Sequence, residues 1–395
     1  MKKYNFDEII DRRGTSSLKY DFGMQRKGRD DLLPLWVADM DFKLPTAILD
    51  DLHKRISHGI FGYTDPNEEY FEALNYWFKK YHNYTVDPNT VTLGCGIVYG
   101  IATAVKSFTN KGDSIIIQQP VYYPFRECIE DNDRLFINNQ LVLENNRYKI
   151  DFEDFEKKII DNNVKMFILC NPHNPVGRVW SRDELTKLLD ICYKYKVIVV
   201  SDEIHCDLIY KGNKFTSVFN LEDKYREILV LMTSPSKTFN IAGFQPSNII
   251  IPNENLRMKF RKEKAKTGYS QGSLMGQVAL TTCYKNGEDW YLELLDYLED
   301  NLNYFRKFIK EKLPMANLIE PEGTYLLWVD FSNYNFTADE LDDIIINDAK
   351  LWLDSGKVFG SESEKFQRFN IACPRSILED ALERLQIAIN KKNNI

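Results

Sequence analysis

Five segments of this chain each follow a short apolar run and carry residue types that can perform covalent or acid–base chemistry. A lysine amine can form a Schiff base with an aldehyde, and a carboxylate beside a ring nitrogen keeps that nitrogen protonated. A glycine turn before a helix offers backbone N–H groups to a phosphate. The candidate residues are the glycine turn Gly94-Cys-Gly96, the pair Tyr122 and Tyr123, Asn174, Asp202 and Lys237.

Each candidate also has an ordinary structural explanation. The glycine turn is equally compatible with a simple tight turn, and Asp202 could be a helix cap or a structural hydrogen-bond acceptor. Taken singly, Lys237 is better explained as a solvated loop lysine, and Tyr122 and Tyr123 as packing aromatics. The NPHNP stretch at 171–175 could be only a rigid turn, because proline fixes φ. As a set, however, a phosphate cradle, an acid, a lysine and a flat aromatic match what pyridoxal 5′-phosphate (PLP) requires.

The elements that would position these residues are predicted from hydrophobic patterning. Continuously apolar runs of strand length suit parallel strands that are covered on both faces. A helical pattern begins at Ser181, where Ser181 and Glu184 have the spacing of a capping box. This alternation predicts an α/β domain with a largely parallel sheet, whose ligands bind beyond the carboxyl ends of its strands. The runs are 91–93, 114–117, 166–169, 197–200 and 228–232.

The last third of the chain follows a different pattern. A long helix is predicted over about 289–313, followed by strands at 324–330 and 366–372. Two capping boxes, Thr337/Glu340 and Ser376/Glu379, predict the starts of two further helices. We therefore expect a smaller α+β domain at 285–395, a large domain at 46–284, and an N-terminal segment at 1–45 that joins the small domain.

Composition excludes several classes of protein. The 395 residues are 44% hydrophobic and 28% charged, and the net charge of −7 argues against a nucleic-acid binder. No apolar run reaches the roughly 18 residues of a membrane-spanning helix, and MKKYNFDEIIDRR at 1–13 does not resemble an export signal. The seven cysteines include no CxxC pair and the five histidines form no HExxH, so we expect reduced thiols, a cytoplasmic location and no metal.

Three motifs identify a family resemblance: CNPHNPVGRVW at 170–180, SDEIHCDL at 201–208 and PSKTFNIAG at 235–243. They resemble fold-type I PLP enzymes of the class I/II aminotransferase superfamily. The segments WVADMD at 36–41, GYT at 62–64 and EGTY at 322–325 narrow the resemblance to the bacterial cystathionine β-lyase (cysteine C–S lyase) branch. The resemblance covers nearly the whole chain and implies an aspartate aminotransferase-like fold with a mostly parallel seven-stranded sheet.

The resemblance also implies a role for each cofactor-binding residue. Lys237 would carry PLP on its amine and act as the base, Asp202 would pair with the pyridine nitrogen, Asn174 would contact the ring hydroxyl oxygen and the substrate, and Tyr122 would stack on the ring. We count Lys237, Tyr122 and Asp202 as catalytic. The implied phosphate donors are the backbone N–H groups of Gly96, Ile97 and Val98 and the side chains of Ser234 and Ser236.

The remaining implied contacts concern the substrate and a second subunit. Arg368 would clamp the substrate carboxylate with its planar fork, beside Tyr123. Tyr63 would reach the phosphate in the neighbouring active site of a homodimer. The sequence departs from many aminotransferases at Gln245, where they have a phosphate-binding arginine, and at His205, where they often have a tyrosine. His205 could contact the ring hydroxyl oxygen or could be a structural histidine.

The function implied is β-elimination from cystathionine or a related S-substituted cysteine. The products would be a thiol, pyruvate and ammonia. An aminotransferase of amino acids would use the same cofactor residues and is the alternative enzyme. A regulatory protein with a PLP fold is a third interpretation, which the intact candidate residues Lys237, Asp202, Asn174 and Arg368 disfavour.

Overall fold

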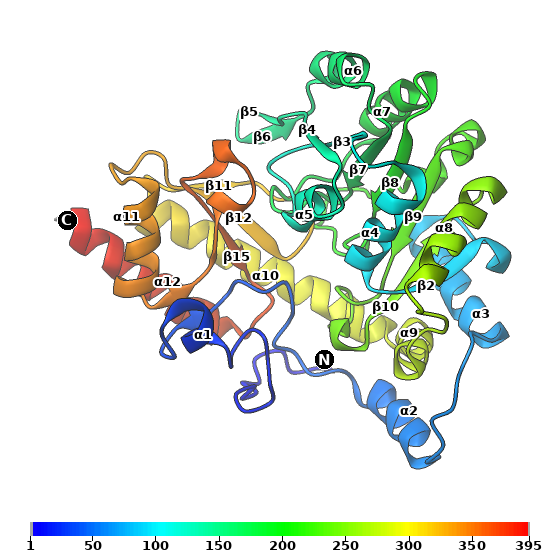
Figure 1. The fold of residues 1–395 in the computed structure, drawn as a ribbon. Coiled ribbons are helices and arrows are strands. Elements are labelled where there is room, and N and C mark those ends of the chain that lie inside the picture. Colours follow the sequence, from blue (N-terminus) through cyan, green and yellow to red (C-terminus); the bar gives the residue numbers. More distant parts are fainter. Residues whose placement is uncertain (1–2, 394–395) are drawn as a thin grey trace.

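Seven strands form the central sheet of the computed structural model, which describes residues 3–393 (Figure 1). β10 is antiparallel to both of its neighbours, and the other strand pairs are parallel. The predicted largely parallel sheet is therefore confirmed. In spatial order the strands are β2 (Val91–Cys95), β10 (Pro246–Ile250), β9 (Leu229–Thr233), β8 (Ile198–Asp202), β7 (Met166–Cys170), β3 (Ser114–Ile117) and β4 (Leu135–Asn138).

The central strands are apolar because helices cover both faces of the sheet. Every residue of β3, β7 and β9 is buried, and alternate residues enter two separate apolar clusters. Ile168 packs in the cluster that contains residues of α4, α5 and α8, whereas Phe167 packs in the cluster that contains residues of α7 and α9. These helices are α4 (Ile97–Phe108), α5 (Pro124–Glu130), α7 (Arg182–Lys194), α8 (Glu254–Lys266) and α9 (Leu274–Asn286).

Two strands of this sheet were not located from the sequence. β10 begins with Pro246, Ser247 and Asn248, so only its last two residues are apolar. β4 is an edge strand in which Leu135 is exposed. β10 therefore lacks the continuous apolar run that revealed the central strands, and the apolar run of β4 is only three residues long (Leu135, Phe136 and Ile137). The predicted capping box at Ser181 and Glu184 is present at the start of α7.

A second, antiparallel sheet occupies the C-terminal third, beside the long helix α10 (Glu288–Lys312) (Figure 1). The Thr337/Glu340 capping box is confirmed at the start of α11. The Ser376 cap is wrong: α12 begins at Arg375, so Ser376 lies inside the helix, and the Pro374 carbonyl accepts from the N–H groups of Ile377 and Leu378. The elements are β11 (Asn317–Ile319), β12 (Leu326–Asp330), β15 (Phe366–Asn370), β14 (Asp354–Ser355), α11 (Ala338–Asp343) and α12 (Arg375–Asn393).

The N-terminal segment runs along this second sheet. β1 (Leu33–Pro34) pairs in parallel with β13 (Leu351–Trp352). Further along, the Leu35 carbonyl accepts from the Asn370 N–H at 2.9 Å, and the Asp41 N–H donates to the Ala372 carbonyl at 3.0 Å. The three domain ranges given above remain a prediction, which this contact supports.

The other elements complete the large α/β region and its periphery. No helix among residues 3–393 combines the length and the apolar character needed to cross a membrane. None of the seven cysteines forms a disulfide bond in the structure. The remaining elements are α1 (Gly23–Lys27), α2 (Thr46–Ser57), α3 (Glu68–Trp77), α6 (Phe152–Asp161) and the hairpin β5 (Val142–Glu144) and β6 (Arg147–Lys149).

Candidate active site

The carboxyl ends of three neighbouring strands bring the predicted residues to one edge of the sheet. Cys170 at the end of β7 lies opposite Asp202 at the end of β8, and Asp202 lies opposite Met232 on β9. Asn174 follows β7 and Lys237 follows β9, so the loops that carry them leave the sheet at the same edge as Asp202. Strand register alone therefore gathers the lysine, the acid and the amide.

Lys237 is partly buried, and its Nζ donates a hydrogen bond to the backbone carbonyl of Ala38 at 2.6 Å. Burial lowers the pKa of Lys237 to about 8, against the opposing effects of the Asp39 and Asp202 carboxylates. The positive charge of Arg368 adds to the lowering. A substantial fraction of this amine is therefore neutral near pH 7 to 8, as a nucleophile or base requires.

Asp202 is 5% exposed, and burial raises its pKa to about 7. Within the described chain its side chain accepts one hydrogen bond, from the Ile204 N–H to Oδ1 at 3.0 Å. The charge of Lys237 lowers the pKa of Asp202, so the two groups lie within electrostatic reach of each other. A buried carboxyl group with a single neutral donor is an environment that favours a cationic partner.

Arg368 lies in the middle of β15, buried to 3% exposure, and its guanidinium has three partners on three different segments. Nη1 donates to Asn174 Oδ1 at 3.1 Å, and Nη2 donates to the Trp36 carbonyl at 2.7 Å and to the carboxylate of Asp354. Its Nε is buried and has no partner among residues 3–393. The contact with Asn174 places the predicted carboxylate clamp beside the predicted cofactor edge.

Tyr122 and Tyr123 are partly buried, with ring centroids 5.6 Å apart. Burial, Tyr123 and the Asp202 charge raise the pKa of Tyr122, whereas Arg368 lowers it. Tyr122 is therefore neutral and close to both charged residues. Tyr123 meets Phe359 edge-on at 6.1 Å, and the Arg368 guanidinium lies 5.1 Å from the centre of the same ring. The two tyrosines thus border the same region as the arginine.

Gly96 is the N-cap residue of α4, with φ +106°, a conformation that favours glycine. A Cβ at this position would meet nothing within 4 Å, so the space above the turn is open. The Gly96 N–H donates to Ser247 Oγ at 3.1 Å. Ile97 and Val98 begin the helix, where backbone N–H groups have no carbonyl one turn earlier. These two are therefore better placed than Gly96 to donate to an anion.

Ser234 and Ser236 adjoin Lys237, and both are buried. Ser234 Oγ donates to the Pro246 carbonyl at 2.5 Å and lies 2.7 Å from Ser236 Oγ. Each hydroxyl has one proton, so with Ser234 donating to Pro246 the 2.7 Å contact uses the proton of Ser236, and either serine would have to exchange one of these hydrogen bonds to donate to a ligand. Gln245 ends a short 3-10 turn at φ +55°, and its amide supplies no positive charge.

His205 is 4% exposed, and its Nδ1 is buried without a hydrogen-bond partner in the described part of the chain. Burial holds its pKa well below the usual range, and the charges of Lys237 and Arg368 lower it further. The ring meets Tyr325 edge-on at 5.9 Å. A neutral imidazole with an unsatisfied nitrogen beside the lysine fits a contact with a bound ligand.

Sequence reasoning missed the residues that the N-terminal segment brings to Lys237. The Ala38 carbonyl accepts from Lys237 and also from the Tyr325 hydroxyl at 2.9 Å. The negative charge of Asp39 raises the pKa of Lys237. WVADMD and EGTY were noticed as motifs, but nothing in them indicated a contact with the lysine. A backbone carbonyl leaves no signature in the residue type.

Residues 30–385 match the family model described as "Aminotransferase class I and II". The chain belongs to this family. It is 41% identical to cystathionine beta-lyase PatB of Bacillus subtilis (strain 168) over 386 residues, which cover 98% of this chain and 100% of that protein. This result confirms the family predicted from the three motifs.

Solved structures of high similarity have the same fold. Cystalysin from Treponema denticola, whose structure contains a pyridoxal 5′-phosphate cofactor, aligns with a TM-score of 0.95 and 36% identity, covering 98% of this chain and 99% of that chain. The PLP-bound C–S lyase from Staphylococcus hominis aligns with a TM-score of 0.90 and 35% identity, covering 98% of each chain. The predicted aminotransferase-like fold is therefore confirmed.

Proposed function

We propose that this member of the aminotransferase class I and II family is a PLP-dependent C–S lyase. It would catalyse β-elimination of cystathionine or a related S-substituted cysteine to a thiol, pyruvate and ammonia. The observation that carries the proposal is the joint placement of Lys237 and Asp202 at one sheet edge, within electrostatic reach of each other. The similarity to cystathionine beta-lyase PatB and to two PLP-containing structures supports it.

The residues present fit PLP on three separate grounds. The buried Asp202 carboxyl group has no hydrogen-bonded cation among the described residues, and a protonated pyridine nitrogen would supply one. His205 Nδ1 is buried and unpartnered, and a ring oxygen would satisfy it. The open turn at Gly96 leads into the first N–H groups of α4, which suit a phosphate.

When bound, PLP supplies an electron sink for the carbanion that forms at the substrate Cα. Lys237 would hold the cofactor covalently through Nζ and, once released, remove the Cα proton. Arg368 would bind the substrate carboxylate, and Asn174 and Tyr123 would border it. Tyr122 would pack on the cofactor ring, and the phosphate would accept from Ile97, Val98 and Ser236. The thiolate would leave with the Cβ–S electron pair, and the aminoacrylate, once released, would be hydrolysed by water to pyruvate and ammonia.

The proposed enzyme is a homodimer in which Tyr63 completes the neighbouring site. Tyr63 is 97% exposed, and Ile60 and Phe61 beside it are 67% and 59% exposed. Figure 1 shows α2 and the segment after it projecting from the rest of the chain. Large apolar side chains on a projecting segment are typical of an interface, so we assign them to a second copy of this chain.

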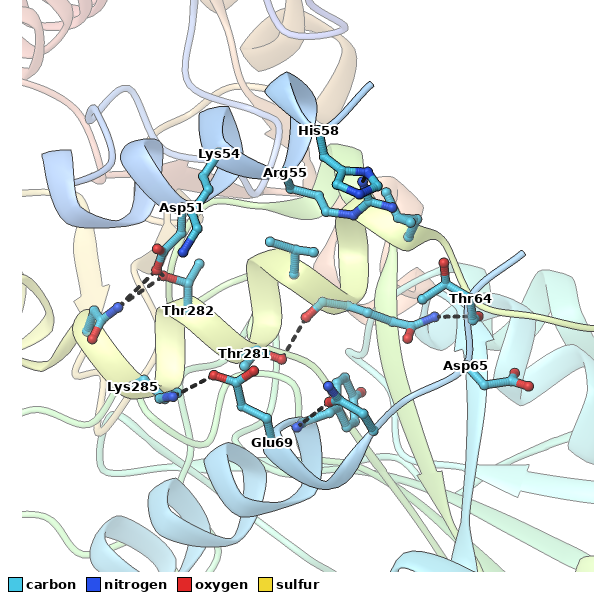
Figure 2. Close-up of a pocket in the computed structure, with 16 residues that line it drawn as sticks. Asp51, Lys54, Arg55, His58, Thr64, Asp65, Glu69, Thr281, Thr282 and Lys285 are labelled. Atoms are coloured by element: carbon cyan, nitrogen blue, oxygen red, sulfur yellow. Dashed lines mark hydrogen bonds and ion pairs between the residues drawn. The ribbon is translucent and has the colours of Figure 1, made fainter. Parts of the chain in front are cut away.

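A hollow of about 710 Å³ beside this segment supports the same assignment. Figure 2 shows lining residues from α2 (Asp51, Arg55), α3 (Glu69) and α9 (Thr282, Lys285), together with others on the segment between α2 and α3. Lys285 pairs with Glu69 at 2.6 Å, and Thr282 donates to Asp51 at 2.5 Å. The charged lining and the exposed apolar residues would together face the second copy.

The proposed location of the enzyme is the cytoplasm, because the seven cysteines of the chain are free.

Product analysis tests the proposed reaction. The purified holoenzyme is incubated with cystathionine in the absence of any added keto acid. A lyase gives pyruvate, ammonia and homocysteine in equal amounts, and Lys237→Ala, the control, gives none. If amino acid is consumed only when a keto acid is supplied, the protein is an aminotransferase and the proposal is wrong.

A further inference from the structure

The Ala38 carbonyl is the acceptor for the free amine of Lys237. It lies 2.6 Å from Lys237 Nζ and 2.9 Å from the Tyr325 hydroxyl, and both groups donate to it. The lysine and its acceptor are 199 residues apart in the sequence. In the proposed function a substrate displaces this amine from the cofactor, and the Ala38 carbonyl is then within hydrogen-bond reach of it.

Side chains on both sides hold the backbone around Ala38 in place. Asn370 Nδ2 donates to the carbonyls of Val37 and Asp39, each at 2.6 Å. Asn240 binds both backbone groups of Met40, at 2.9 Å and 2.8 Å. The carbonyl that accepts from Lys237 therefore has a fixed position and does not depend on a mobile side chain.

A buried group of charges holds Asp39, the residue next to Ala38. Arg12 binds Asp39 with both arms of its fork, at 2.6 Å and 3.0 Å, and also donates to Asp41 at 2.7 Å. Lys19, which is completely buried, lies 2.7 Å from Asp41 and 3.6 Å from Asp39. The two negative charges of Asp39 and Asp41 are therefore matched by the two positive charges of Arg12 and Lys19. Asp39 is only 16% exposed, so its interaction with Lys237 is weakly screened.

We propose that the Ala38 carbonyl and the Asp39 carboxylate form the docking position of the protonated Lys237 amine, and that Arg12 and Lys19 hold this position in place. The inference rests on the proposed function, in which Lys237 takes the Cα proton. In that step the Cα–H bond breaks, an N–H bond forms at Nζ, and the electron pair stays on the substrate. Asp39 and Ala38 are positioning residues, because they act through Lys237.

Docking the ammonium has a consequence for the outcome of the reaction. A proton held on Nζ by Ala38 and Asp39 is retained by the lysine and is not returned to the substrate. Retention gives the thiolate time to leave from Cβ, whereas transfer of the proton from Lys237 to the carbon of the cofactor that had carried the aldehyde would favour transamination. The segment 36–41 therefore favours elimination through the position of the Lys237 proton.

The charged and titratable groups that face Lys237 come from four segments. Asp39 and Asp202 favour its protonated form, Arg368 disfavours it, and His205 is neutral because its pKa is held well below the usual range. Tyr325 reaches the lysine only through the shared Ala38 carbonyl. Of these groups Asp39 has the largest effect on the pKa of Lys237 after burial. Removing its charge should therefore lower the pKa of Lys237.

The test uses the cofactor-free protein, in which the amine itself can be titrated. Acetic anhydride is applied over a range of pH, and modification of Lys237 is followed by peptide mass spectrometry. The pH at which Lys237 is half-reactive should be at least half a pH unit lower in Asp39→Asn than in the wild type. Tyr325→Phe should move it upward, because the Ala38 carbonyl then has one donor instead of two. Asp31→Asn, which removes an acid paired with Arg29, is the matched control with no shift.

Two opposite shifts keep the test decisive if one variant fails to fold. The inference would be overturned if the midpoint pH of Lys237 acetylation were unchanged in Asp39→Asn. A lower midpoint pH in Tyr325→Phe would overturn it as well. In the holoenzyme, Asp39→Asn should also convert several-fold more cofactor to its amine form per elimination event, visible by absorption. If borohydride does not fix the cofactor to Lys237 in the wild type, the proposed function fails. If borohydride fixes the cofactor to Lys237 but the acetylation midpoints do not move, the proposed function stands and only the proposed docking position is wrong.

Discussion

Arg368 and Asp354 lie directly opposite each other on the neighbouring strands β15 and β14, and their side chains form an ion pair. The arginine is 3% exposed at its side chain and the acid 13%, so the pair is largely removed from water. Burial raises the pKa of Asp354, and the charge of Arg368 opposes that rise. The guanidinium proposed to clamp the substrate is thus oriented and charge-balanced before the substrate arrives.

Replacing Arg368 tests the clamp. Arg368→Lys keeps the positive charge but loses the planar fork that contacts Asn174, Trp36 and Asp354 together. Hydrogen bonds to charged groups contribute about 1.5–3 kcal/mol, so kcat/KM should fall by roughly 10- to 100-fold, mainly through KM. Steady-state kinetics with an S-substituted cysteine measures this. An unchanged KM would show that the substrate carboxylate is bound elsewhere.

Asp354→Asn should have the opposite effect on KM. The asparagine oxygen can still accept from Arg368, but its charge no longer competes with the substrate carboxylate. We expect KM to fall several-fold while the absorption spectrum of the bound cofactor stays the same. Titration with a simple monocarboxylate inhibitor should show tighter binding. A higher KM would mean that the charge of Asp354 serves mainly to orient the arginine.

Asp202→Asn should stabilise the cofactor-free protein in a pH-dependent way. The folded-state pKa of about 7 lies above the ordinary value of 3.8, so the ionised carboxyl group destabilises the fold. The cost is absent below the ordinary value, grows as pH rises from about 4 to 7, and is complete above 7. Urea unfolding should therefore show the advantage of the variant growing by about 2–3 kcal/mol from pH 5 to pH 8.

The same substitution should weaken the holoenzyme, since the cofactor nitrogen would lose its charged partner. Turnover should fall by orders of magnitude, with the variant still able to attach the cofactor. An apoprotein whose stability relative to the variant does not change with pH would contradict the environment described for Asp202.

The contribution of Tyr63 from a second subunit can be tested by complementation. Tyr63→Ala and Lys237→Ala should each be nearly inactive as homodimers. Co-expressed with different tags, they should form hybrid dimers in which one site has both Lys237 and a partner tyrosine. Activity of the doubly tagged fraction should approach half that of the wild type. Hybrids as inactive as the parents would place Tyr63 outside the neighbouring site.

The sequence located the central strands because burial on both faces demands continuous apolar runs. The end of each run then indicated Asn174, Asp202 and Lys237, and the structure brings all three to one edge. The strand predicted at 366–372 carries Arg368 and Asn370, and in the structure both contact the N-terminal segment. β10 offers no such pattern, because Pro246, Ser247 and Asn248 at its start interrupt the apolar residues.

The contacts between distant segments were not predictable. The Ala38 carbonyl has no signature in the sequence, and Asp354 looks like any acid until strand pairing places it against Arg368. The Ser376 cap was wrong because that helix already begins at Arg375, with the Pro374 carbonyl accepting its first hydrogen bonds. The engaged N–H of Gly96 depends on Ser247, which lies 151 residues later.

The most direct test of the central claim is to map the cofactor on the chain. The holoenzyme is reduced with borohydride, digested and analysed by mass spectrometry. We predict a phosphopyridoxyl group on Lys237, with unmodified peptide in the Lys237→Ala variant. Attachment at another lysine, or no attachment in the wild type, would contradict the assignment of this site.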